Sequence, residues 1–340
     1  MFPFLIPKIE LIPFDRNSGL HHIMDEFPYA SLVAALGKRS TARDADTMGK
    51  KGKKGQAGKP KKLTPKDISK RLDALVKKLE EELEGADLFV PSPPMDDCPI
   101  CLVRLSRMQD NSTYQVCCGK YICNACFKDN ITFVERKKKN AGKKQIIHTC
   151  PLCREPLPSE EEILHLGELR ASQGDPVSLT SLGNAYTRGQ YGLHRNELKA
   201  LDYWIRAVEV GSADACTAIA IDLRNGIGLS ANMEKAALFA TVGAIRGDVK
   251  ARSNIGFIEY YDIGNHELGI RHWKIAAEAG SQPALDCLKG IYNANGKRPG
   301  KEFISKEDMD RIYRAGHKAQ EMVKTEEREK HYDTEDKMKC

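Results

Sequence analysis

The sequence has few aromatic residues and no long apolar run. Phenylalanine, tryptophan and tyrosine make up 7% of its 340 residues. No stretch approaches the roughly 18 consecutive apolar residues of a membrane-spanning helix. The apolar opening, Met1 to Phe14, is interrupted by prolines and by Lys8 and Glu10, which is not the pattern of a secretory signal. We therefore expect an intracellular protein, cytoplasmic or nuclear, without a membrane segment.

Several motifs of well-known enzymes are also missing. The sequence has no Gly-x-x-x-x-Gly-Lys-Ser/Thr, no Gly-x-Gly-x-x-Gly and no His-Glu-x-x-His, which gives no support to phosphate-loop, dinucleotide-binding or zinc-protease chemistry. Apolar residues make up 41% of the chain and charged residues 29%. This composition allows a sizeable core and is typical of a helical, soluble protein.

The net charge of +6 is unevenly distributed, and much of it lies in two lysine-rich tracts. Residues 50–62 contain seven lysines and no acid, and residues 136–144 contain six basic residues. These tracts could contact nucleic acid, act as a nuclear import signal or lie near an acidic partner, but solvated loops are an equal alternative. Neither tract contains the aromatic residues of a base-stacking platform, so we do not expect nucleic acid as the main partner. Residues 1–63 are expected to be a largely disordered linker.

An amphipathic helix is predicted over residues 64–85. Thr64 and Pro65 have the character of an N-cap and a first helical residue, and Gly85 is a typical helix stop. Apolar residues recur at helical spacing: Ile68, Leu72, Leu75, Leu79 and Leu83. The apolar face could pack on a neighbouring module or form a short coiled coil that dimerises the chain. The pattern covers only about two heptads.

Beyond residue 170 the chain repeats itself. Four glycines recur at intervals of 37, 36 and 33 residues: Gly174, Gly211, Gly247 and Gly280. Each unit has the pattern helix, glycine-containing loop, helix, with loops at 189–194, at 226–230 and around Gly264. Such units bury their apolar faces only by stacking, which predicts an α-solenoid over residues 170–332. The last unit has a longer loop at 295–304 and a long, charged second helix that begins with a capping box at Ser305. This unit is expected to form a terminal cap. A disordered tail is expected at 333–340.

This region resembles the SEL-type helical repeats, which are relatives of the tetratricopeptide repeat. The resemblance rests on the period, the paired helices and the small-residue spacing. It implies a scaffold that binds a protein substrate or a protein complex.

Eight of the eleven cysteines lie between residues 98 and 153: Cys98, Cys101, Cys117, Cys118, Cys123, Cys126, Cys150 and Cys153. They form three Cys-x-x-Cys pairs and one adjacent pair. Zinc takes four thiolates in a tetrahedron, so eight cysteines fill two structural sites. In an intracellular chain such clusters bind metal more often than they form disulfides. Residues 96–156 are therefore predicted to hold two zinc ions, and with little other core the module should unfold without them.

The module resembles the RING finger in Cys98-Pro-Ile-Cys101, in the segment 118–126 and in Cys150-Pro-Leu-Cys153-Arg154. The resemblance implies a cross-brace, with one zinc on Cys98, Cys101, Cys123 and Cys126 and the other on Cys117, Cys118, Cys150 and Cys153. Lys120 stands where most RING fingers have histidine, so the module is more similar to the all-cysteine RING of the deadenylase-complex ubiquitin ligase. The central ligands are adjacent here, and His148 could replace one of them.

RING fingers bind a ubiquitin-conjugating enzyme and hold its ubiquitin thioester in a reactive conformation, so no catalytic nucleophile is expected. The resemblance assigns enzyme contacts to Ile100, Pro151 and Arg154. Asn130 departs from the pattern, because ligases place an apolar or aromatic contact there. Ile131 or Phe127 could substitute if the helix is rotated.

The expected fold is mostly α-helical, with a small two-zinc cross-brace RING module, an α-solenoid of helix-turn-helix repeats and a disordered basic N-terminal region. The leading hypothesis is a ubiquitin ligase whose repeats recruit a substrate. The alternative is a non-enzymatic adaptor in which zinc only stabilises a small fold.

Overall fold

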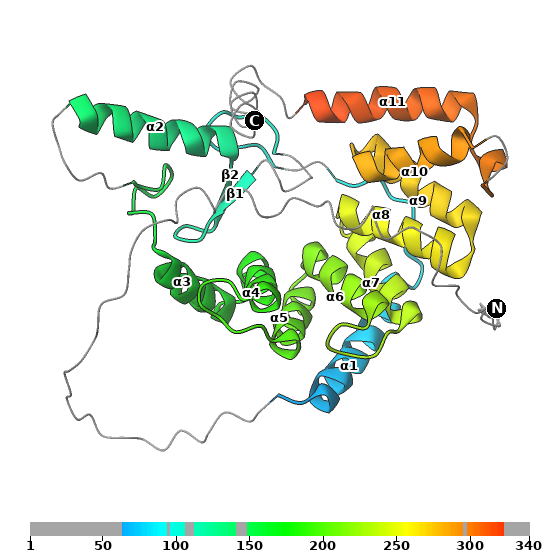
Figure 1. Ribbon diagram of the computed structural model, residues 1–340, viewed down its shortest axis with the longest axis horizontal. Coiled ribbons are helices and arrows are strands. Elements are labelled where there is room, and N and C mark those ends of the chain that lie inside the picture. The colour runs from blue at the N-terminus through cyan, green and yellow to red at the C-terminus, as the bar shows by residue number, and fades with distance from the viewer. Residues whose placement is uncertain (1–62, 94–95, 106–111, 141–147, 295–297, 323–340) are drawn as a thin grey trace. The chain divides into compact units, whose positions relative to one another are not determined.

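A computed structural model describes residues 63–93, 96–105, 112–140, 148–294 and 298–322. The described chain is mostly helical, with a single two-stranded sheet (Figure 1). The predictions for the linker 1–62, for the lysine tract beyond Asn140 and for the tail 333–340 lie outside the described residues. Within the described ranges, no helix has the length and apolar character needed to cross a membrane.

Helix α1 spans Pro65–Leu83 and begins with a capping box in which the Thr64 side chain accepts from the Asp67 backbone N–H. Its apolar stripe is buried, with each of Ile68, Leu72, Leu75 and Leu79 at most 3% exposed. The stripe packs against helices α5 (Glu197–Glu209) and α7 (Met233–Ile245) of the same chain. The face that could have formed a coiled coil is therefore covered by the repeats.

The repeats consist of four helix pairs preceded by α3 (Glu160–Ser172). The pairs are α4 (Pro176–Arg188) with α5, α6 (Ala213–Asn225) with α7, α8 (Val249–Phe257) with α9 (His266–Glu278), and α10 (Gln282–Tyr292) with α11 (Lys306–Glu321). Each of the four predicted boundary glycines has a positive φ, between 81° and 99°. The next residue caps the first helix of the unit through its side chain: Asp175, Ser212, Asp248 and Ser281.

Two helices within a unit approach closely because a glycine faces a tryptophan. A Cβ added at Gly183 would overlap the indole of Trp204, and one at Gly256 would lie 2.6 Å from that of Trp273. The indole N–H of Trp204 donates to the Thr180 carbonyl at 3.3 Å. The equivalent bond in the third unit, from Trp273 to the Ser253 carbonyl, measures 3.1 Å.

Neighbouring units are linked by hydrogen bonds at equivalent positions. The Thr180 hydroxyl bonds Ser212 at 2.9 Å, and the Ser253 hydroxyl bonds Ser281 at 2.8 Å. Between the second and third units, Thr217 donates to Asp248. In each case a first helix contacts the N-cap of the next first helix, which is the repeating contact expected of a stacked array.

The third and fourth units depart from the regular pattern. After α8 the chain forms a π-helical turn at Ile258–Ile263, which the glycine spacing did not predict. The fourth unit has a short 3-10 helix at Lys301–Phe303, and Ser305 opens α11 with the expected capping box. The described part of α11 ends at Glu321, whereas the sequence predicted a helix to about Tyr332; residues 323–332 lie outside the described residues.

Candidate metal centre

The cysteines lie around a small β-hairpin and the helix that follows it. Strand β1 (Ser112–Gln115) pairs antiparallel with β2 (Lys120–Cys123), and Ser112 faces Cys123. Helix α2 (Asn124–Asn140) follows β2 directly. The hairpin turn contains Cys117 and Cys118 and closes at Gly119, whose φ is 72° and whose N–H donates to the Gln115 carbonyl at 2.7 Å. This tight turn is the bend that adjacent ligands require.

The first and last cysteine pairs form two knuckles of the same construction. In the first, the Leu102 N–H donates to the Cys98 carbonyl at 2.9 Å, and in the second, Arg154 does the same to Cys150 at 2.9 Å. Leu102 and Arg154 both have positive φ, 58° and 65°. An isolated bridge closes each knuckle, between Asp97 and Arg104 and between Thr149 and Pro156.

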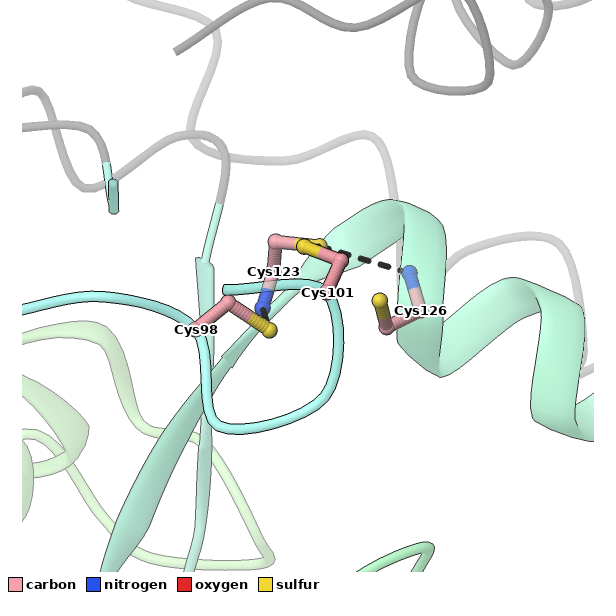
Figure 2. A group of neighbouring side chains, drawn as sticks. All are labelled: Cys98, Cys101, Cys123 and Cys126. Carbon is pink, nitrogen blue, oxygen red and sulfur yellow. Dashed lines mark hydrogen bonds between the residues drawn. The ribbon is translucent and has the colours of Figure 1, made fainter. Parts of the chain in front are cut away.

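The first group of sulfurs comprises Cys98, Cys101, Cys123 and Cys126. Figure 2 shows that the first two come from the knuckle loop and the last two from the end of β2 and the first turn of α2. Backbone N–H groups point at these sulfurs, since Cys123 N lies 3.4 Å from Cys98 Sγ and Cys126 N lies 3.4 Å from Cys123 Sγ. Four ligand atoms thus converge within 4.8 Å of one another.

The second group comprises Cys117, Cys118, Cys150 and Cys153, whose sulfurs also lie within 4.8 Å of one another. Both adjacent cysteines of the hairpin turn belong to it, and His148 does not belong to this group. In sequence order, the first cysteine pair joins the third and the second joins the fourth. The two groups therefore interleave along the sequence.

The sulfur separations fit a metal of zinc's size. Four sulfurs at about 2.3 Å from a central zinc lie about 3.8 Å apart along each edge of the tetrahedron. The structure has 3.8 Å between the sulfurs of Cys101 and Cys123 and 3.9 Å between those of Cys118 and Cys150. The sulfurs of Cys117 and Cys153 lie 3.4 Å apart. Each tetrad is therefore placed to hold a metal ion, with one edge of the second tetrad shorter than that of a regular zinc site.

Electrostatics inside the groups favour a bound cation. Burial raises the pKa of the Cys126 thiol, and the neighbouring thiols of Cys123 and Cys98 raise it further. Burial alone would also raise the pKa of Cys98, but backbone N–H groups directed at its sulfur lower it to about 7. Four thiolates at this separation repel one another, so a divalent ion is what would keep all four deprotonated.

The second sulfur group is attached to helix α3 by an arginine that no sequence motif marks. Arg170 on α3 donates from Nε to the Val116 carbonyl and from Nη2 to the Cys117 carbonyl at 3.0 Å. A Cβ at Gly119 would lie 2.5 Å from Arg170 Nη1, so the guanidinium fits tightly around the cysteine turn. Nearby, the Tyr114 hydroxyl donates at 2.7 Å to Asp175, the N-cap of α4.

The residues expected to contact a conjugating enzyme lie on the knuckles. Ile100 is 43% exposed in the first knuckle. In the second, Pro151 is half-buried and Arg154 is exposed. Asn130, the departure from the RING pattern, donates from Nδ2 to the Thr149 carbonyl at 2.8 Å and so ties α2 to the second knuckle.

Neither substitute suggested for Asn130 is fully exposed. Phe127 packs against the small core of the module, and Ile131 is half-buried. Two exposed apolar side chains were missed in the sequence, Leu102 at 77% and Phe133 at 63%. Phe133 could have been found from its spacing, since it stands seven residues after Cys126 and so shares a helix face with it and Asn130.

No protein-family model matches the sequence, and no curated protein matches it. Among solved structures, the chain is similar to a Sel1 repeat protein from Oxalobacter formigenes, with a TM-score of 0.40 and 22% identity over 49% of this chain and 67% of that one. It is also similar to c5321, a protective antigen of uropathogenic Escherichia coli with an SLR fold, with a TM-score of 0.39 and 20% identity over 47% of this chain and 34% of that one. The repeat architecture is evident in the helix pairs, the N-caps and the hydrogen bonds between units of the chain itself.

Proposed function

We propose that the chain is a two-zinc RING-type ubiquitin ligase that docks a conjugating enzyme on residues 96–156 and a protein partner on its repeats. The observation that carries this proposal is the interleaving of the two sulfur groups. In a linear two-zinc module the first and second cysteine pairs would share one zinc and the third and fourth pairs the other. The RING resemblance implies that the first and third pairs share one zinc and the second and fourth pairs the other. Zinc is the metal that four thiolates at this spacing fit best, and it would act as a structural ion.

The exposed side chains of the knuckles supply the proposed docking surface. Ile100 offers an apolar contact and Arg154 a guanidinium that can donate to two acceptors at once. The one-turn shift from Asn130 to Phe133 gives α2 an exposed aromatic side chain that can take over the missing apolar contact. Exposed apolar residues of this size are common in interface cores.

The ligase would act without a covalent intermediate. The thiols in the two groups would be held by metal. Burial raises the pKa values of Cys216 and Cys287 to about 12, so both stay protonated and poorly nucleophilic. The conjugating enzyme would carry the thioester, and this chain would only bind and orient it.

A reconstituted ubiquitin-transfer assay over a panel of conjugating enzymes tests the proposal. Ile100→Ala and Arg154→Ala should each lower transfer at least about tenfold while two zinc ions per chain are retained, because hot-spot contacts are worth over about 1.4 kcal/mol. Lys120→Ala is the matched control, since it also removes one exposed positive charge beside the second sulfur group. Transfer that survives both substitutions, with zinc bound, would show that the docking surface is wrong.

One observation favours the non-enzymatic adaptor as a second candidate. Asn130 occupies the position of a usual enzyme contact but makes an internal hydrogen bond to the Thr149 carbonyl instead. The adaptor predicts two bound zinc ions and no transfer with any conjugating enzyme of the panel. Metal analysis that gave no zinc would contradict both candidates.

A further inference from the structure

A short segment between α1 and the zinc module, residues 87–93 (the strap), lies in a site formed by the third repeat unit. Arg252 on α8 donates to the Leu88 carbonyl and, at 2.9 Å, to the Val90 carbonyl. The Phe89 ring stacks on His272 of α9 with centroids 5.2 Å apart. The guanidinium of Arg271 lies 3.6 Å from the centroid of the same ring.

The strap has a defined local shape. The Asp87 carboxylate accepts the Phe89 N–H at 2.9 Å, which makes an Asx turn and presents two alternate carbonyls to one guanidinium. At the C-terminal end, Pro93 sits over Gly247, where a Cβ would lie 2.8 Å from the proline Cδ. The features that the repeats contact are therefore a turn-forming acid, an aromatic ring and backbone carbonyls.

Arg252 has the properties of a binding group that its present partners only partly satisfy. Its side chain is 0% exposed, and among the described residues it forms no ion pair. Its guanidinium bonds three carbonyls, the third being that of Ala244 at 3.0 Å, and its Nη1 lies 3.4 Å from His272 Nδ1, whereas its Nε has no hydrogen-bond partner. A buried guanidinium without a carboxylate partner is costly, and burial lowers the pKa of Arg252 although the charge of Asp87 raises it.

The strap is held by few side chains of its own. Asp87 and Pro91 are exposed and Val90 is 40% exposed, so the attachment consists of the Phe89 ring, the two carbonyls and the end of the strap, where Ser92 is buried and Pro93 contacts Gly247. Any peptide with the same turn and ring could make these contacts. The strap keeps its place because it is tethered, and a short tether gives an effective concentration of about millimolar.

We propose that α8 and α9 form a docking site for a turn-forming segment of a partner protein, with an acidic residue two positions before an aromatic one, and that the strap occupies this site in cis. The proposal rests on the proposed function only in assigning partner docking to the repeats. In this site Arg252 binds backbone carbonyls of the partner segment, and Arg271 and His272 contact its aromatic ring.

The test uses a fluorescent synthetic peptide with the sequence of residues 86–93 and the full-length chain. Phe89→Ala weakens the strap, so the peptide should bind this variant at least about tenfold more tightly than the wild type, where it competes with the tethered strap. Adding Arg252→Met to Phe89→Ala should remove the binding. Val90→Ala, which keeps the carbonyl and removes an exposed side chain, is the control and should behave as the wild type.

Equal peptide affinity for the wild type and for Phe89→Ala would overturn the proposal, as would binding that survives Arg252→Met. Should Arg252→Met lose its helical circular dichroism, Arg271→Ala in the Phe89→Ala background replaces it, because Arg271 is exposed and only covers the ring. A peptide with Asn in place of the acid should bind more weakly. None of these residues lies on the knuckles. Peptide binding can therefore fail while ubiquitin transfer succeeds, and ubiquitin transfer can fail while peptide binding succeeds.

Discussion

Replacing Arg170 by methionine should loosen one zinc site and leave the other intact. Methionine keeps the apolar stem of the side chain and removes the donors to the carbonyls of Val116 and Cys117. A hydrogen bond from a charged donor contributes about 1.5–3 kcal/mol when buried. Arg170 is half-buried, so we take about 2 kcal/mol for the pair. This corresponds to a roughly 30-fold loss of zinc affinity at the site of Cys117 and Cys118, within the 10- to 100-fold range typical of outer-shell partners.

A competition titration with a chromophoric chelator measures this loss. The wild type should release two zinc ions, and in Arg170→Met one of them should leave at a lower chelator concentration. Arg206→Met is the matched control: it removes an arginine that donates to the Ala171 carbonyl at 3.4 Å and makes no bond to the zinc module. Unchanged release of both ions, or equal weakening of both, would refute a specific link between Arg170 and the second site.

Three further outcomes follow from the helix packing, from one buried acid and from the proposed metal sites. Gly183→Ala should lower the free energy of unfolding by about 1–3 kcal/mol, because the added Cβ overlaps Trp204. Gly167→Ala is the control: its Cβ would meet Leu182 at 3.7 Å, an ordinary contact, so it should raise the free energy of unfolding by up to about 1 kcal/mol. Urea unfolding measures both. Burial, together with the charge of Glu197, raises the pKa of Asp222 to about 7, so the folded protein favours the protonated carboxyl. The stability that this proton contributes is fully present below about pH 4 and is lost as the pH rises towards 7. Calorimetry should therefore show a higher Tm for Asp222→Asn than for the wild type at pH 8, and little difference at pH 4. Zinc removal should unfold residues 96–156, seen as lost amide protection, while protection in α4–α10 persists.

The repeat units could be predicted because their signals are local. A glycine with positive φ followed by a capping side chain marks each boundary, and both residue types are chosen by backbone conformation rather than by distant contacts. The π-helical turn at Ile258–Ile263 was not predictable in this way. It lies in an aromatic cluster in which Tyr260 of the turn packs on Trp273 of α9, with ring centroids 5.0 Å apart, and this contact has no signature in the glycine spacing.

For the candidate metal centre, the cysteine pairs were predictable from the sequence, but their partners across the module were not predictable from spacing. Spacing alone indicated the Cys-x-x-Cys knuckles, since two intervening residues suffice for a turn that aims both sulfurs at one ion. Which knuckle joins which came from the RING resemblance, because interleaving depends on contacts between residues over 20 positions apart. The role of Asn130 was hidden for the same reason, as its bond to Thr149 spans 19 residues and has no sequence signature.

Two arginines, Arg170 on α3 and Arg252 on α8, join the zinc module to the rest of the chain. Arg252 holds the strap that leads into Cys98, and Arg170 holds the turn that carries Cys117. Both bind backbone carbonyls, so both attachments depend on the backbone conformation of the segment that is held, and the strap is held in addition by its Phe89 ring. Loss of the second metal would release the turn at Cys117 to which Arg170 is hydrogen-bonded. Displacement of the strap would leave the hydrogen bonds of Arg170 in place. The two attachments can therefore be broken independently, one by metal removal and the other by a competing peptide.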